Sequence, residues 1–236
     1  MPHVIEASDA APGDVVTAGE VVYVYELPVR LWHWVTALAI TVLMVTGYLI
    51  GSPPPSVSGE AYQHFLMGDI RFAHFAAGQV LAVAFLFRAF WACVGNAHSR
   101  QSFIVPVWRL RWWKEVVHVM LWYSFLTSRP HRYVGHNPLA QVAMFIVMVP
   151  LSLFMLCTGF ALYSEDKGMG SWQAKAFGWV FSIWPNSQAV HTWHHLGLWA
   201  MMVFILVHTY LVIREDIVSR QSIISAMISG HRTFRE

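Results

Sequence analysis

The stretch His191–Arg214, HTWHHLGLWAMMVFILVHTYLVIR, is an apolar run with histidines near both ends. If it forms one helix, His194 and His208 lie about 21 Å apart along the axis and about 40° apart around it. Two histidines on one face, near opposite edges of a hydrocarbon slab about 30 Å thick, have little use in a soluble core. The pattern predicts a membrane helix that contributes to one metal centre near each leaflet.

Composition places the chain among integral membrane proteins. Of its 236 residues, 56% are hydrophobic and 12% are charged, and its mean hydropathy is +0.48. Soluble domains carry about 25% charged residues. Twelve tryptophans and eight tyrosines suit aromatic belts at two membrane interfaces. The long apolar runs predict an all-α integral membrane fold, because a helix satisfies its own backbone in lipid. We expect membrane lipid as a partner and no nucleic acid.

Three further apolar runs, Leu31–Ile50, Phe72–Val94 and Leu139–Tyr163, are each long enough to cross a bilayer. Together with His191–Arg214 they predict a four-helix transmembrane bundle. Another segment, Val107–Thr127, mixes basic residues with four tryptophans. Its charge-free part is too short to span, so we expect a cytoplasmic interfacial helix rather than a fifth span.

Charge and composition divide the chain into three regions. Residues 1–25 are predicted to be a disordered tail without the features of a signal peptide. Residues 26–214 form the membrane domain, and residues 215–236 a cytoplasmic tail. Segments 1–30, 95–138 and 214–236 carry 1, 6 and 4 Lys or Arg, whereas 51–71 and 164–190 carry 1 and 2. The positive-inside rule therefore predicts a multi-pass protein of a bacterial inner membrane with both termini in the cytoplasm.

In this orientation the histidines of the four spans fall at two levels. His33 on the first span lies near the cytoplasmic face, and His74 on the second lies near the outer face. His208 matches the level of His33, and His194 matches that of His74. Facing neutral imidazoles are good axial ligands for haem iron. We therefore predict two b haems, held by the pairs His33/His208 and His74/His194.

The other histidines receive different interpretations. His191 and His195 remain alternatives to His194, although their helical angles fit the face of His208 less well. Five histidines outside the spans are expected to be ordinary polar residues: His64, His98, His118, His131 and His136. Three of these face the cytoplasm, where a proton donor to a quinone would be useful: His118, His131 and His136.

Three glycines and one arginine are predicted to contact the cofactors. Gly47, Gly78 and Gly197 lie near the outer pair, where a flat macrocycle could approach a helix. Arg88 lies within a span at the level of the inner pair, and an arginine there needs a partner. A haem propionate would provide one through a bidentate, charge-assisted contact. The alternative is that Arg88 extends to the cytoplasmic interface.

The two cysteines, Cys93 and Cys157, lie in apolar stretches and are expected to be small buried side chains. No CxxCH or CxxC motif occurs, so neither covalently attached haem nor an iron–sulfur cluster is predicted. The four thiolates of a nickel site are also absent. Any hydrogen-splitting chemistry would therefore belong to a partner.

Short pieces along the chain carry a family resemblance. In order they are PVRLWHW, VTGYLIG, IRFAHFAAG, FIVPVW, GHNPLAQ, GFALYSE, HTWHHLG and REDI. Their order and spacing, from about Glu26 to the C-terminus, resemble the b-type cytochrome subunit of membrane-bound nickel–iron uptake hydrogenases. The resemblance implies a four-helix bundle with two b haems, and its ligands map to His33, His74, His194 and His208.

The resemblance also implies a function. The chain would anchor the iron–sulfur small subunit and the nickel–iron large subunit to the membrane and pass their electrons to a quinone. We expect it to be no enzyme on its own, but the electron-transfer and quinone-reducing subunit of a hydrogen:quinone oxidoreductase. The outer loops 51–71 and 164–190 would dock the partners.

Spacing and composition alone leave other functions open. A cytochrome b of formate dehydrogenase or of a related quinone-linked oxidoreductase would have the same design. A histidine-lined metal transporter is a second alternative, but it predicts acidic ligands within the spans, which contain no Asp or Glu. A third is a haem-free anchor whose histidines are incidental.

Overall fold

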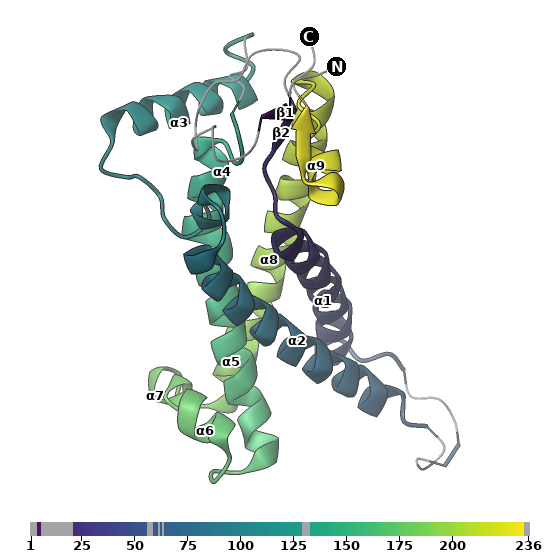
Figure 1. Cartoon of the computed structure of the whole chain (residues 1–236). Coiled ribbons are helices and arrows are strands. Elements are labelled where there is room, and N and C mark those ends of the chain that lie inside the picture. The colour runs from purple at the N-terminus through teal and green to yellow at the C-terminus, as the bar shows by residue number, and fades with distance from the viewer. Residues whose placement is uncertain are drawn as a thin grey trace. The chain divides into compact units, whose positions relative to one another are not determined.

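The computed structural model describes residues 4–5, 21–55, 59–60, 62, 64–128 and 133–233. The chain divides into two compact units. The first unit comprises residues 1–33, 87–149 and 204–236, and the second comprises residues 34–86 and 150–203. Each of the four long helices contributes residues to both units (Figure 1).

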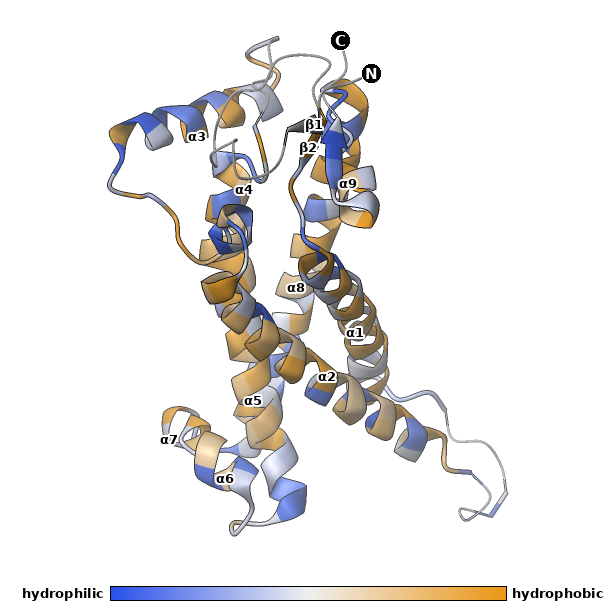
Figure 2. Ribbon diagram, viewed as in Figure 1, coloured by the Kyte–Doolittle hydropathy of each residue, from blue (hydrophilic) through white to orange (hydrophobic). Residues whose placement is uncertain are grey.

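Four helical segments are long and apolar enough to cross a membrane, which confirms the four predicted spans. They are Leu27–Gly51 (α1), Leu66–Val94 (α2), Pro138–Lys167 (α4, η3 and α5) and Ser187–Val218 (α8). Figure 2 shows apolar residues along most of each segment. Large apolar side chains stay exposed on them, which suits contact with lipid rather than water; examples are Leu38, Val83 and Leu206. Each helix exceeds the predicted run because residues beyond its apolar centre continue the same hydrogen bonding.

The third membrane helix contains a π-helical turn that the sequence analysis did not predict. Pro138–Ala143 (α4) and Val149–Lys167 (α5) are joined by the π turn Met144–Met148 (η3). Pro150 is the second residue of α5, and a proline has no N–H and crowds the carbonyl four residues before it. A π turn relieves this conflict without ending the helix. The span therefore continues through the proline.

A small sheet in the first unit joins the two ends of the chain. Val4–Ile5 (β1) pairs in parallel with Val21–Tyr23 (β2), and β2 pairs in antiparallel with His231–Thr233 (β3). Side chains near the sheet form a buried core: Val22, Val24, Tyr25, Val29, Val134 and Ala226. The fold is therefore mainly but not purely helical.

The sheet also changes the interpretation of both predicted tails. Within the predicted disordered tail 1–25, the structure contains the strands β1 and β2, while residues 6–20 lie outside the described residues. Within the predicted tail 215–236, α8 continues to Val218, and Ile223–Ser229 (α9) and β3 follow. Strands of two or three residues carry no usable periodicity, and their stability comes from pairing between opposite ends of the chain.

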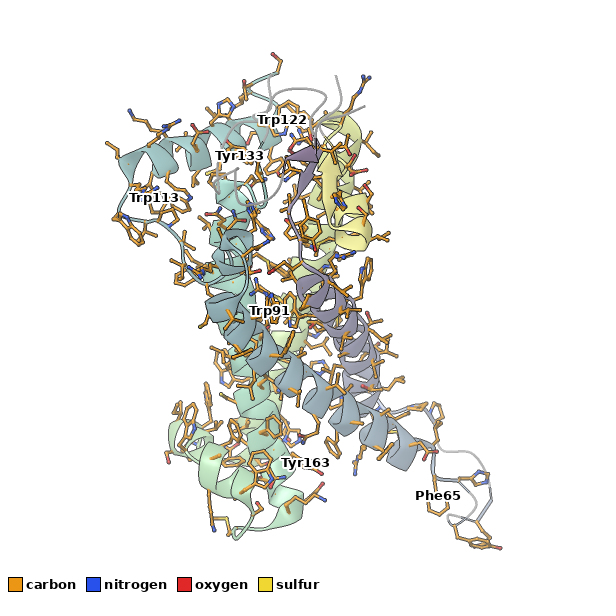
Figure 3. The ribbon with its side chains drawn as sticks, viewed as in Figure 1. Phe65, Trp91, Trp113, Trp122, Tyr133 and Tyr163 are labelled. Carbon is orange, nitrogen blue, oxygen red and sulfur yellow. The ribbon has the colours of Figure 1, made fainter. Side chains whose placement is uncertain are left out.

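Leu110–Tyr123 (α3) is the amphipathic helix predicted within Val107–Thr127. Its buried residues recur at helical spacing on one face; they are Trp112, Val116, Val119 and Trp122. The ring centre of Trp122, labelled in Figure 3, lies 4.8 Å from the guanidinium carbon of Arg214. The Nη2 of Arg214 also donates to the Trp122 carbonyl at 3.2 Å. This cation–π contact attaches α3 to the last turns of α8 within the first unit. The position of α3 in a membrane interface stays a prediction.

The second unit has more helix than expected. The segment 164–190, predicted as a loop, contains Trp172–Phe177 (α6) and Val180–Ile183 (α7). A buried cluster of Ala161, Val180 and Val190 holds these short helices against α5 and α8. In the first unit, a short 3₁₀ helix, Ala97–Arg100 (η2), lies between α2 and α3 along the chain.

Candidate functional site

A cavity of about 770 Å³ lies within the second unit. Residues of α1, α2, α5 and α8 line it, and most of its lining is apolar. Pockets for small ligands and cofactors have volumes of about 300–1,000 Å³ and combine apolar walls with a few polar groups. His74 and His194 are among those polar groups. The size and lining of the cavity suit a large, mainly apolar cofactor.

The rings of His74 and His194 are spaced as two ligands of one metal ion would be. Their centres lie 6.4 Å apart and their planes are inclined by 75°. A metal–imidazole bond is about 2.0 Å long, so two imidazoles on one ion have ring centres about 6 Å apart. Within the ranges that the structure describes, no three His, Cys, Asp or Glu side chains form a metal-ion site. Two facing imidazoles therefore fit an ion whose remaining ligands come from a macrocycle.

Both rings are held through the same nitrogen. His74 Nδ1 lies 2.9 Å from Thr46 Oγ1, and His194 Nδ1 lies 2.8 Å from Thr158 Oγ1. Because Nδ1 is engaged in both residues, Nε2 is the nitrogen left to bind a metal ion. Metal-ligating histidines commonly have this arrangement. Neither threonine was predicted as a site residue from the sequence, although each stands in a Thr-Gly dipeptide of a predicted span.

The structure distinguishes among the three histidines at the start of α8. The ring of His194 lies beside His74, as predicted. The ring of His195 instead lies 6.1 Å from that of Trp199 between centres, and a Cβ added to Gly51 would lie 2.7 Å from His195 Cε1. His191 Nδ1 lies 3.0 Å from the carbonyl oxygen of Ser187. His194 is therefore the candidate ligand whose position agrees with the predicted pair.

The three predicted glycines occupy different surroundings. A Cβ added to Gly47 would lie 3.2 Å from His74 Cε1, so this glycine makes room for the ligand ring. Gly78 lines the cavity, and a Cβ there would meet only Leu43, at 4.0 Å. Gly197 instead faces Phe154 and Met155 of α5. This glycine allows α8 to pack closely on α5, and its predicted contact with a cofactor stays a prediction.

Charged residues occur at the cavity, and none of them was predicted. Arg71 lies on α2 one turn before His74, and Glu165 and Asp166 lie at the end of α5. Tyr163, labelled in Figure 3, packs its ring against Phe75 at 4.7 Å between centres. Arg71 is a possible partner for an acidic group of a cofactor.

Arg88 lies in the first unit and is almost completely buried, with 3% of its surface exposed. Its Nη2 donates to the Ser99 carbonyl at 2.6 Å, and its guanidinium carbon lies 5.3 Å from the ring centres of Trp32 and Phe103. Among the described residues, Arg88 Nε and Nη1 and Trp32 Nε1 are buried donors without a hydrogen-bond partner. Buried donors of this kind are costly unless an acceptor binds them. They fit an anionic group such as a haem propionate, and the role of Arg88 as its partner stays a prediction.

The predicted inner ligands, His33 and His208, both belong to the first unit. The ring of His208 stacks on that of Phe204 with 5.9 Å between centres. Their role as a ligand pair stays a prediction.

Of the histidines expected to be ordinary polar residues, His98 is buried and His136 is partly buried in the first unit. His98 is 1% exposed, and Gln101 connects it with His136: Gln101 Nε2 lies 3.4 Å from His98 Nδ1, and Gln101 Oε1 accepts from the His136 backbone N–H at 2.9 Å. Burial, together with the positive charges of Arg88 and other neighbouring groups, lowers the pKa of His136 to about 3. His136 is therefore neutral at pH 7. His118 lies on α3, and His131 lies outside the described residues.

Comparisons with known proteins place these features in context. A family model described as prokaryotic cytochrome b561 matches residues 24–230. The probable Ni/Fe-hydrogenase B-type cytochrome subunit of Bradyrhizobium diazoefficiens is 61% identical over 246 residues, which cover 100% of both chains. The corresponding protein of Azotobacter vinelandii is 60% identical over 215 residues, or 91% of this chain and 90% of that one. In Escherichia coli, the probable Ni/Fe-hydrogenase 1 B-type cytochrome subunit is 50% identical over 215 residues, which cover 90% of this chain and 91% of that one.

Proposed function

Because this chain belongs to the prokaryotic cytochrome b561 family, as a b-type cytochrome subunit associated with a nickel–iron hydrogenase, we propose that it carries electrons from its partners to a quinone. It would hold two b haems, one with His74 and His194 and one with His33 and His208. It would also anchor the hydrogenase to the inner membrane, with both of its own termini in the cytoplasm.

The placement of His74 and His194 is the observation that best supports this function. Both rings line one cavity, their centres are 6.4 Å apart, and the Nδ1 of each is held by a threonine. Haem iron bound by two imidazoles cycles between ferric and ferrous states and has no open position for oxygen chemistry. The residues of the cavity would exclude water and hold the two imidazoles in place.

Buried polar groups of the first unit support quinone reduction near His208. Reduction of a quinone to a quinol takes up two electrons and two protons. His136 and His98 are joined through Gln101, and the positive charge of Arg88 acts on His136. A neutral imidazole can both donate and accept a proton. We infer that this group of residues would pass protons to a reduced quinone.

The first experiment measures haem in the detergent-purified protein. A dithionite-reduced-minus-oxidised spectrum and pyridine haemochrome quantitation should give about two b haems per chain. A folded helical protein without b haem would contradict the proposal and favour an anchor with incidental histidines. Copurification with an enzyme that oxidises formate but not hydrogen would contradict the assignment of the partner.

Replacement of His136 by alanine tests the route of protons. We expect both haems to be retained and hydrogen-dependent quinone reduction by the whole complex to fall by about 100-fold, the lower range for loss of a general acid or base. His231→Ala removes an exposed imidazole on β3, serves as the matched control and should leave turnover unchanged. Unchanged turnover in His136→Ala would remove this residue from the mechanism.

A further inference from the structure

We propose that two Thr-Gly dipeptides, Thr46–Gly47 on α1 and Thr158–Gly159 on α5, act as matching clips that prepare His74 and His194 to bind iron through Nε2. Each threonine would be a positioning residue that sets the tautomer of one histidine, and each glycine would make room for its ring. This inference rests on the proposed haem-binding function and adds the residues that orient its ligands.

The direction of each hydrogen bond follows from the single proton of a hydroxyl group. Thr46 Oγ1 lies 2.6 Å from the Val42 carbonyl oxygen, and Thr158 Oγ1 lies 2.7 Å from that of Phe154. A carbonyl only accepts, so each hydroxyl must donate its proton to the carbonyl four residues before it. The hydroxyl then has no proton left for the imidazole and can only accept from it.

The tautomer of each histidine follows from this arrangement. His74 Nδ1, 2.9 Å from Thr46, must carry a proton and donate, and so must His194 Nδ1, 2.8 Å from Thr158. A neutral imidazole carries one ring proton, so the lone pair is on Nε2 in both residues. The histidines are thereby prepared as neutral Nε2 ligands before any metal binds.

The two glycines pack against the two histidine rings in the same way. A Cβ added to Gly47 would lie 3.2 Å from His74 Cε1, and one added to Gly159 would lie 3.2 Å from His194 Cε1. Contacts this short would force each ring to move by a few tenths of an ångström. Each clip therefore combines a hydrogen bond at Nδ1 with close packing at the neighbouring ring carbon. This explains why one dipeptide occurs on two different helices, VTGYL in α1 and CTGFA in α5.

The hydrogen bond also has an electronic consequence. A ligating histidine that donates its other N–H becomes a more basic ligand, and loss of such a partner commonly lowers metal affinity or activity about 10- to 100-fold. A more basic ligand favours ferric over ferrous iron. Loss of either threonine hydroxyl should therefore weaken haem retention and raise the reduction potential of the same centre.

The test replaces the hydroxyl by a methyl group in Thr46→Val and Thr158→Val, studied in the purified holoprotein. We expect each variant to raise the reduction potential of one b centre by up to about 59 mV. For a one-electron couple this corresponds to a tenfold change in the equilibrium constant between the ferric and ferrous forms. The ferric EPR signal of that centre should also change, because its ligand rings are less firmly held. The potential of the other b centre should stay unchanged.

Two matched variants separate hydrogen bonding from packing. Thr46→Ser and Thr158→Ser keep the hydroxyl and should restore the potential and the EPR signal. Thr41→Val removes a similar hydroxyl on α1, which donates to the Ala37 carbonyl at 2.8 Å and is exposed, and should have no effect. If a valine variant loses its haem, retention of haem in the serine variant still supports the proposal.

Three results would decide against the clips or against the function behind them. Wild-type potentials and EPR signals in both valine variants, with two b haems present, would overturn the clips and leave the proposed function intact. Equal loss of haem in the valine and serine variants would also overturn them, because packing rather than the hydroxyl would then matter. A wild-type protein without b haem would instead contradict the proposed function itself.

Discussion

His194→Ala should leave about one b haem per chain instead of two. The imidazole of His194 lies 6.4 Å from that of His74 between ring centres, so its removal leaves the iron of this cavity with one protein ligand. Truncation also leaves the hydroxyl of Thr158 without the ring that it holds. Pyridine haemochrome quantitation and a redox titration should show that one b centre is lost and that the other keeps its potential.

Two neighbours on the same helix provide controls for this variant. His191→Ala and His195→Ala remove an imidazole within one turn of His194, but His191 Nδ1 lies at the Ser187 carbonyl and the ring of His195 lies beside Trp199. Both variants should retain two b haems. If His195→Ala loses a haem and His194→Ala does not, the assignment of the ligand is wrong.

Arg88→Gln should have the second largest effect, at the other b centre. The guanidinium is 3% exposed, and two of its nitrogens have no hydrogen-bond partner among the described residues. If a propionate binds there, truncation leaves a buried carboxylate unpaired, a change that commonly costs about 2–5 kcal/mol in a buried charge pair. We therefore expect loss of most of the haem from this site. Any haem that remains should have a lower potential, because an unpaired negative charge favours ferric iron.

Unfolding of the haem-free protein provides a second, independent test of the Arg88→Gln variant. Without an anion, Arg88 is a buried and incompletely paired charge, and its removal should leave the resistance to unfolding equal or higher. Arg88→Lys should fall between wild type and Arg88→Gln, because lysine keeps the charge but not the bidentate geometry. Arg71→Gln, at the cavity of the second unit, should leave this centre unchanged. Normal haem content and potentials in Arg88→Gln would exclude Arg88 as a haem partner.

The sequence was sufficient where the physical signal is local. A run of about 20 apolar residues predicts a membrane helix on length alone, and all four predicted helices are present. The apolar spacing within Val107–Thr127 likewise predicted α3. The motifs that carried the family resemblance were equally local, and the comparisons confirm that resemblance.

The candidate site was only partly predictable, because its geometry depends on contacts between helices. Helical periodicity ranked His194 above His191 and His195, but only the folded second unit shows which ring lies beside His74. Gly197 shares the predicted face near His194, yet it packs against Phe154 because helix rotation and tilt decide which neighbour a residue meets.

The sequence by itself therefore determined the membrane class, the four spans, the family and the set of candidate histidines. Tertiary structure decided which groups are partners: Thr46 for His74, Thr158 for His194, and no carboxylate for the buried Arg88 among its described contacts. The reason is that hydrophobicity and helical spacing act over a few turns of one chain segment. A hydrogen bond between two helices also requires their relative rotation to within a fraction of a turn, and that is set only when the helices pack together.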